Sequence, residues 1–186
     1  MKVMVFGGSG VGKTTLASEV AVRVGFKHLD SDDYYWKQTR PTFQGKRSFF
    51  SRNRKIKVDF KKYDDVIISG CMMTWGKEWH SAFDMAVFIR LENELRLARL
   101  RKREIQRYGK ALKHDNKVKE NSKLFLEWAK LYENPNYKGN TLFSHEKWMK
   151  SCNSEVLRLD GRHSLKSNIL KVINEIEKLR ETVCKK

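Results

Sequence analysis

The sequence predicts an α/β fold in which helices cover both faces of a parallel sheet. Short apolar runs that fit buried strands recur along the chain, and stretches with helical spacing separate them. The first run, residues 3–6, leads through a glycine-rich turn into a helical stretch that begins near Thr15. Because such sheets bind ligands at the carboxyl ends of their strands, we expect the functional site there.

The remaining elements follow from local composition. Further strands are expected at residues 26–29, 66–70, 85–90 and 156–159, and helices at about 92–108, 124–129, 144–149 and from Leu165 onward. In the last helix the apolar residues Leu165, Ile169, Val172, Ile176 and Leu179 recur every three or four positions. Residues 37–62 are basic and poorly periodic, which favours a partly helical insert on the substrate side. The polar residues 110–120 are interpreted as a loop.

Composition limits the class of protein. The 186 residues fit one domain, and no apolar run approaches the ~20 residues of a membrane span. The chain starts with a strand rather than a signal peptide, so we expect a cytoplasmic protein. Three cysteines without paired spacing indicate reduced thiols. The net charge of +17 exceeds what one nucleotide requires, so nucleic acid is a candidate partner beside a generally basic surface.

The strongest motif occupies residues 7–14, which read Gly-Gly-Ser-Gly-Val-Gly-Lys-Thr and match G-x-x-x-x-G-K-[ST] between a strand and a helix. Such a P-loop wraps phosphates with backbone amides, at a helix N-terminus that favours negative charge. The predicted role of Lys13 is to reach the β- and γ-phosphates, and that of Thr14 to coordinate Mg²⁺. The nucleotide-binding candidates are Gly7, Gly8, Ser9, Gly10, Val11, Gly12, Lys13, Thr14 and Thr15.

An acidic cluster ends the expected second strand. Asp30, Asp32 and Asp33 lie close to the P-loop if the sheet is parallel. One carboxylate can hold a Mg²⁺-bound water, and another can accept a proton from an attacking hydroxyl. The alternative is a helix N-cap with acidic residues in the first turn.

Arginines recur along the helix expected at residues 92–108. Arg96, Arg99, Arg103 and Arg107 share one arc of a helical wheel, and Leu91, Leu95, Ala98 and Ile105 share the arc that is expected to pack. Arginines that close on a transferring phosphoryl group stabilise its charge. A solvated basic face or a nucleic-acid contact is the alternative.

With these residues in place, the chain resembles the nucleoside and nucleotide kinases of the P-loop class. The resemblance is greatest to the small bacterial set of adenylate kinase and related kinases, some of which are called topology modulation proteins. It rests on the P-loop, His28-Leu29-Asp30, Ile67-Ile68-Ser69-Gly70, Phe83-Asp84 and the arginine helix. It implies a three-layer P-loop NTPase fold with five parallel strands in the order 2-3-1-4-5, and a lid at about residues 103–122.

The resemblance also implies roles for particular residues. Asp30-Ser31-Asp32 is similar to the Asp-x-Asp of shikimate kinases, in which the first carboxylate serves Mg²⁺ and the second serves the substrate. Arg99 and Arg103 resemble the arginines on the lid side of adenylate kinases, which contact the nucleotide and its phosphates. Asp160-Gly161 resembles the turn that passes the adenine ring, so Gly161 is a further nucleotide-binding candidate.

One feature departs from these relatives. They often carry Asp-Gly at the end of the third strand, where this chain has Ser69-Gly70. Metal binding must then depend on Thr14, Asp30 and water. The predicted function is an ATP- and Mg²⁺-dependent phosphotransferase with Lys13, Asp32, Arg99 and Arg103 as catalytic candidates. Its acceptor is a small molecule that bears a hydroxyl or phosphate group, of the nucleoside or nucleoside monophosphate class.

Two alternatives stay open. A nucleic-acid-associated ATPase or polynucleotide kinase would use the net charge and the aromatic residues beside arginine near Phe49 and Phe50. A non-catalytic nucleotide-binding regulator would explain why Ser69 stands where related kinases often have an aspartate.

Overall fold

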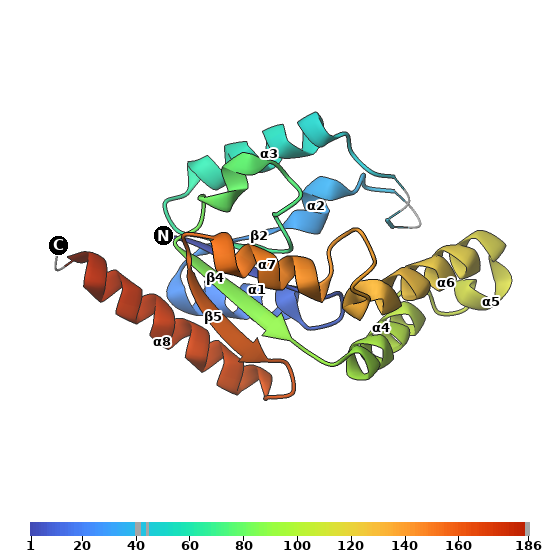
Figure 1. Cartoon of the computed structure of the whole chain (residues 1–186). Coiled ribbons are helices and arrows are strands. Elements are labelled where there is room, and N and C mark those ends of the chain that lie inside the picture. Colours follow the sequence, from blue (N-terminus) through green and yellow to red (C-terminus); the bar gives the residue numbers. More distant parts are fainter. Residues whose placement is uncertain (40–41, 44, 185–186) are drawn as a thin grey trace.

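Five parallel strands run through the middle of the computed structural model, which describes residues 1–39, 42–43 and 45–184, with side chains to residue 182 (Figure 1). The strands are β1 (Lys2–Gly7), β2 (Lys27–Asp30), β3 (Val66–Ser69), β4 (Met85–Arg90) and β5 (Glu155–Asp160). They pair in the order β2-β3-β1-β4-β5, which confirms the predicted order.

The helices connect these strands. They are α1 (Lys13–Val24), α2 (Ser31–Tyr35), α3 (Phe49–Lys62), α4 (Asn93–Tyr108), α5 (Ala111–His114), α6 (Asn116–Lys130), α7 (Leu142–Ser151) and α8 (Leu165–Cys184). Two 3₁₀ turns, η1 (Lys77–His80) and η2 (Leu131–Glu133), complete the described elements. Within the described residues, no helix is long and apolar enough to cross a membrane.

Two apolar cores lie on opposite faces of the sheet. Along β1, Val3 and Val5 face a core shared with α1 and α8, whereas Met4 and Phe6 face a core shared with α3, α7 and η1. All four side chains are at most 1% exposed. This alternation of fully buried residues is what a parallel sheet between two helical layers requires.

The register of the sheet brings the candidate residues to one edge. Gly7 at the end of β1 pairs with Ile89 of β4, and Asp30 at the end of β2 pairs with Ser69 of β3. The carboxyl ends of all five strands point toward the same side of the molecule, where α4, α5 and α6 extend beyond the sheet (Figure 1). The candidate residues at the ends of β1, β2 and β3 therefore lie at the edge of the sheet where we expect the functional site.

The packing face predicted for the arginine helix is wrong. Leu95 and Ile105 are 43% and 63% exposed, and Ala98 is also exposed, although Leu91 just before the helix is buried. The residues of α4 that are buried are Arg96, Leu97, Leu100 and Glu104. The helix packs on the P-loop and on α6 through Leu97 and Leu100. Its buried side therefore differs from the side that the helical wheel predicted.

The loop predicted at residues 110–120 is also wrong, because most of this segment is helical. Asp115 separates α5 from α6 and caps α6, since its Oδ1 accepts hydrogen bonds from the amides of Lys117 and Val118. Val118, Ser122 and Ala129 form the buried side of α6. The many charged residues of this segment led to the prediction of a loop, whereas α6 starts at a single capping residue, Asp115.

The basic insert is partly helical, as expected. Its helix is α3, and the residues before it fold back so that Trp36 forms an antiparallel bridge with Lys46. Residues 40, 41 and 44 of this insert lie outside the described residues. Cys71 and Cys152 are free thiols, and the side chain of the third cysteine, at position 184, is likewise not described.

Candidate functional site

Two glycines of the P-loop have backbone conformations and close contacts that disfavour any larger residue. Gly7 and Gly10 have φ of 142° and 89°, values that side chains disfavour. A Cβ on Gly7 would lie 2.4 Å from the carbonyl oxygen of Ile89, and one on Gly10 would lie 2.8 Å from that of Arg96. The loop is therefore pressed against β4 on one side and α4 on the other.

The loop ends at the N-terminus of α1, where free amides collect. Gly12 is the N-cap and offers no side-chain acceptor to the first turn. The first amides of α1 therefore remain available to an anion, which the helix dipole also favours. Lys13 Nζ donates to the carbonyl oxygen of Gly8 at 3.0 Å, so the ammonium lies over the loop. Burial lowers the pKa of Lys13, and the nearby carboxylate of Asp32 opposes that shift.

Arg96 supports the loop from outside, a role that the sequence did not predict. The side chain is 0% exposed. Its Nη1 donates to the carbonyl oxygen of Ser9 at 2.6 Å, and its Nη2 donates to that of Ala129 at 2.9 Å and to Asn93 Oδ1. These contacts turn the guanidinium away from the phosphate side of the loop. Arg96 thus differs from the other arginines of its arc, because Arg99, Arg103 and Arg107 are exposed.

Tyr132 and His145 form the rest of this support. The guanidinium of Arg96 lies 4.6 Å from the centre of the Tyr132 ring, and the same ring packs against Gly8. The hydroxyl of Tyr132 is hydrogen-bonded to His145 Nδ1 at 2.9 Å. His145 is 1% exposed, and burial lowers its pKa to about 3, so the imidazole is neutral at pH 7. The P-loop therefore rests on side chains from α4, η2 and α7.

Asp30 fits both predictions made for the acidic cluster. One oxygen, Oδ1, accepts from the amide of Asp32 at 3.0 Å, so Asp30 is the N-cap of α2. The other oxygen, Oδ2, accepts from the hydroxyl of Thr14 at 2.9 Å. The cap thus leaves one oxygen of the carboxylate beside the P-loop hydroxyl, and the two candidate metal ligands lie together.

Asp32 lies on α2, two residues after the cap Asp30, and is influenced by charges from the P-loop and from α4. Desolvation and the neighbouring Asp30 raise the pKa of Asp32, and the charges of Lys13 and Arg103 act in the opposite direction. A hydrogen bond from the Trp36 side chain also holds this carboxylate. Desolvation and the neighbouring Arg107 lower the pKa of Arg103. The charges of Lys13 and Arg103 therefore both act on the carboxylate of Asp32.

The third strand supplies no acid to this site. Ser69 is 0% exposed, and its hydroxyl lies 3.0 Å from His28 Nε2 in a hydrogen bond. Among the described residues, no group of three or more His, Cys, Asp or Glu side chains is placed to hold a metal ion. A metal here would depend on Thr14, Asp30, phosphate oxygens and water, which suits Mg²⁺ because that ion keeps several waters.

A cavity of about 200 Å³ lies on the other side of α1. Gly12 and Thr15 border it from the P-loop, Arg99 from α4, and Gly161 from the turn after β5. Arg99 Nη2 donates to the carbonyl oxygen of Gly161 at 3.1 Å. The structure therefore separates two residues that were predicted to act together, since Arg99 borders this cavity and Arg103 lies near Asp32.

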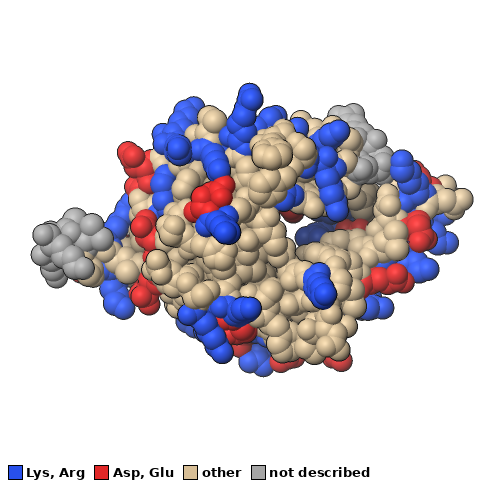
Figure 2. Space-filling model, turned by 45° about the horizontal axis from the view of Figure 1, so that its top comes forward, with Lys and Arg blue, Asp and Glu red and all other residues tan. Residues whose placement is uncertain are grey.

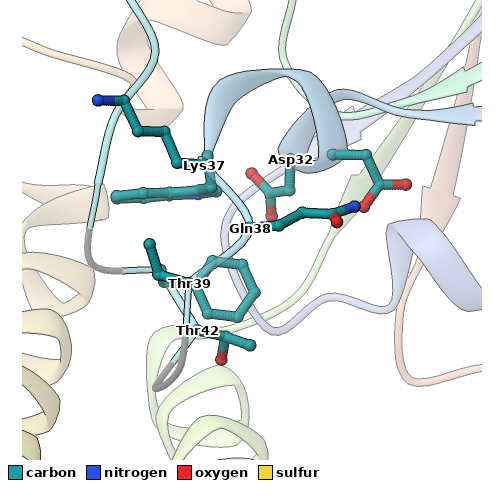
Figure 3. Close-up of a pocket in the computed structure, with 8 residues that line it drawn as sticks. Asp32, Lys37, Gln38, Thr39 and Thr42 are labelled. Atoms are coloured by element: carbon teal, nitrogen blue, oxygen red, sulfur yellow. The ribbon is translucent and has the colours of Figure 1, made fainter.

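A larger pocket of about 500 Å³ opens next to Asp32 (Figure 3). Its described lining comprises Asp32, Asp33, Trp36, Lys37, Gln38, Thr39, Thr42 and Phe43. The sequence predicted a substrate-side insert here but named none of its lining residues apart from the acidic cluster. The signal that was present is the spacing of Trp36 and Phe43, two aromatic residues in an otherwise polar stretch.

Comparisons with known proteins agree with this geometry. Residues 3–123 match the family AAA_18, described as an AAA domain. The chain is 35% identical over 172 residues to the uncharacterized protein YqaC of Bacillus subtilis strain 168, an alignment that covers 92% of this chain and 95% of YqaC.

Two solved structures are similar in fold. A gluconokinase from Sinorhizobium meliloti 1021 has a TM-score of 0.56 and 12% identity, with 98% of this chain and 94% of that chain covered. A deoxyadenosine kinase from M. mycoides with bound dATP has a TM-score of 0.55 and 14% identity, with 95% and 100% covered. At these identities the likeness concerns the fold.

Proposed function

The chain belongs to the AAA domain family AAA_18 and has the fold of the P-loop kinases, and on this premise we propose that it is an ATP- and Mg²⁺-dependent phosphotransferase. The acceptor is a small molecule with a hydroxyl or phosphate group, of the nucleoside or nucleoside monophosphate class, as in enzymes related to adenylate kinase. The observation that carries the proposal is the 2.9 Å hydrogen bond from Thr14 of the P-loop to Asp30, which places the acidic cluster beside the phosphate-binding loop, with Asp32 lining the 500 Å³ pocket.

The P-loop holds the triphosphate in this proposal. Residues 7–15 surround it with backbone amides at the start of α1, and Lys13 leaves the carbonyl of Gly8 to contact the β- and γ-phosphates. The adenine ring enters the 200 Å³ cavity between Arg99 and Gly161. Arg99 then contributes to catalysis indirectly, because it fixes the nucleotide while the phosphoryl group is transferred.

Thr14 and Asp30 are the residues that would hold Mg²⁺. Their paired oxygens, 2.9 Å apart, are hard donors of the type that this ion binds. When bound, Mg²⁺ neutralises charge on the β- and γ-phosphates. Because Thr14 donates its proton to Asp30 Oδ2, the lone pairs of its hydroxyl oxygen stay free for the metal, and Asp30 would hold the hydroxyl or a water ligand in place.

Asp32 and Arg103 serve the transfer itself. The carboxylate of Asp32 orients the acceptor and takes the proton of an attacking hydroxyl, and Arg103 compensates the negative charge of the transferring group. We further propose that residues 103–122 act as a lid and residues 37–62 as the substrate-side insert. Catalysis would consist largely of positioning and electrostatic stabilisation.

The two other candidate functions have less support. Lys and Arg side chains are scattered over the visible face with Asp and Glu between them, rather than gathered in one stripe (Figure 2). The comparisons give no support for a nucleic-acid partner, so this alternative rests on the net charge of +17 and on the exposed Phe49 and Phe50. If the protein were a non-catalytic regulator, the carboxylate of Asp32, on which the charges of Lys13 and Arg103 act, would have no chemical role.

The proposal includes a cytoplasmic location. ATP is available there, and thiols such as Cys71 and Cys152, which are free in the structure, stay reduced in that compartment.

The test is ADP formation with Mg²⁺ across nucleosides, nucleoside monophosphates, sugar acids and 5′-hydroxyl oligonucleotides. Lys13→Ala should abolish turnover, and Lys147→Ala, on the exposed side of α7, should leave it unchanged. Turnover that depends on Lys13 and on one small acceptor is the expected result. ATP binding without turnover on any acceptor would refute the proposal in favour of a regulator, and turnover with oligonucleotides alone would favour the nucleic-acid enzyme.

A further inference from the structure

We infer that the acceptor is an uncharged molecule that carries both a flat ring system and a hydroxyl group, and that phosphate monoesters are excluded. The inference rests on the proposed function and narrows its acceptor class. It comes from the chemistry of the 500 Å³ pocket, whose lining combines carboxylates with aromatic rings.

The first observation is the charge of the pocket. Asp32 and Asp33 both line it. Lys37 is the one basic residue among the described lining residues, and its ammonium points away from Asp32 and Gln38 (Figure 3). Lys13 and Arg103, whose charges act to lower the pKa of Asp32, are assigned by the proposed function to the phosphates of ATP. A phosphate monoester with about two negative charges would therefore approach two carboxylates without a described lining cation turned toward it, whereas an uncharged acceptor meets no such repulsion.

The second observation concerns the proton. A hydroxyl acceptor forms an oxygen–phosphorus bond to the γ-phosphorus while the bond from that phosphorus to the ADP oxygen breaks. The hydroxyl proton must leave, and the carboxylate of Asp32 is the base at the mouth of the pocket. A phosphate acceptor attacks through an oxygen that is already ionised and has no use for a base there. The position of Asp32 therefore suits a hydroxyl.

The third observation is the aromatic corner of the pocket, formed by Trp36 and Phe43. Their rings are 5.7 Å apart between centroids and nearly perpendicular, at 88°. A flat ring can stack on the face of one and meet the edge of the other, an arrangement that aromatic groups favour. Gln38, which also lines the pocket, offers both a donor and an acceptor to ring nitrogens or carbonyls.

Phe43 is held in this corner at a cost to its backbone. Its φ is 67°, which is uncommon for a residue with a bulky side chain. The guanidinium of Arg107 lies 4.5 Å from the ring centre, and the hydroxyl of Tyr108 donates to the carbonyl oxygen of Thr42 at 3.5 Å. Strained residues held by several neighbours cluster at binding sites, so the ring is suited to contact a ligand. Nucleosides combine these features: a flat base, an uncharged sugar and a free hydroxyl.

The experiment compares matched pairs. ADP formation is measured with adenosine, guanosine, cytidine, uridine and their deoxy forms, each beside its 5′-monophosphate, with gluconate and shikimate as acceptors that carry a carboxylate. We expect one or more nucleosides to exceed their monophosphates in kcat/KM by at least about 100-fold, since desolvated like charges are strongly disfavoured.

Two variants give independent readouts. Asp32→Asn should lower kcat for the nucleoside by about 100-fold or more, because the base is lost. If monophosphates were the true acceptors, the same change would raise kcat/KM, because it removes a repelling charge. Phe43→Leu should raise the KM for the nucleoside by about 10-fold with kcat little changed, since stacking is lost without change at the reacting end.

The outcomes separate the two proposals. Turnover that depends on Lys13 but prefers monophosphates, gluconate or shikimate would overturn the inference and leave the phosphotransferase intact. No Lys13-dependent turnover with any acceptor would overturn the phosphotransferase, and the inference with it. Nucleoside turnover that is insensitive to Phe43→Leu would refute the aromatic corner as the ring site.

Discussion

The two sides of the candidate site, which we assign to the nucleotide and to the acceptor, are built differently. On the nucleotide side the groups that face the ligand are mostly backbone amides, fixed by glycines and by the buried guanidinium of Arg96. On the acceptor side they are side chains on α2 and on the residues that follow it, held by contacts such as that of Arg107 with Phe43. The backbone of the nucleotide side is packed against the core, whereas the side chains of the acceptor side can be replaced without disturbing the fold.

One helix contributes to both sides. Arg96 near the start of α4 is buried against the P-loop, whereas Arg103, two turns later, is exposed and lies near Asp32. Residues that look equivalent on a helical wheel therefore have opposite tasks. If this comparison is right, substitutions on the two sides should affect different measurable quantities.

The largest expected effect is that of Arg103→Met on turnover. Loss of the guanidinium should lower kcat by about 1,000-fold, as for other arginines that compensate transferring phosphoryl groups. The free energy of unfolding should change by less than about 0.5 kcal/mol, because the side chain is on the surface. Steady-state kinetics and urea unfolding measure both. Arg101→Met, an exposed arginine of the same helix, is the control, and a similar loss of kcat there would contradict the assignment.

Arg96→Met should show the reverse. It leaves the carbonyl oxygens of Ser9 and Ala129 without their donor, and we expect a loss of about 3 kcal/mol in unfolding free energy. ATP affinity should fall as well, because Ser9 belongs to the loop that holds the phosphates. Calorimetric titration and urea unfolding would test this. A variant that is as stable as the wild type but defective only in kcat would place Arg96 in the transfer step instead.

Gly10→Ala tests the backbone construction of the nucleotide side. The added Cβ would meet the carbonyl oxygen of Arg96 at 2.8 Å, so the loop must shift. Because small displacements of binding groups are costly, we expect ATP affinity to fall by about 100-fold. Gly25→Ala is the matched control, since Gly25 also has positive φ, 72°, but meets nothing within 4 Å. Equal losses of ATP affinity in the two variants would show that backbone strain, rather than the contact with α4, is responsible.

The same division explains what the sequence could predict. The P-loop and the position of Asp30 were predicted from local patterns, and the strand order was predicted from the resemblance to P-loop kinases. The buried role of Arg96 was missed because its partners lie on the P-loop, on α4 itself and on α6. No local pattern reports contacts between residues so far apart in the chain.

The acceptor pocket was beyond prediction for a related reason. The aromatic corner needs Phe43 at an unusual φ and a contact with Arg107, which is 64 positions away. The packing face of α4 was predicted wrongly for the same cause, since exposed Leu95 and Ile105 outweigh a buried arginine in any count of apolar residues. Apolar patterns in a sequence predict the burial that is usual for each residue type. Functional sites often contain residues that depart from this usual burial.

The smallest predicted effect is a pH dependence of stability that arises on the nucleotide side. The folded chain keeps His145 neutral, because burial lowers its pKa to about 3, whereas the unfolded chain binds a proton with a pKa of about 6.5. The stabilisation is therefore complete above about pH 6.5 and is lost as pH falls toward 3. Between pH 7 and pH 5 this residue should account for a loss of about 2 kcal/mol.

Urea unfolding of the wild type and of His145→Phe at the two pH values isolates this contribution. The difference in unfolding free energy between the two proteins should shrink or reverse by about 2 kcal/mol at pH 5, since phenylalanine takes up no proton. Burial also lowers the pKa of His28, so the wild type alone would not separate the two histidines. His114→Gln, on the exposed surface, serves as the control for the loss of a histidine. An unchanged difference between wild type and His145→Phe would mean that His145 is protonated in the folded chain at pH 5. The claim that a neutral His145 supports the P-loop through Tyr132 would then be wrong.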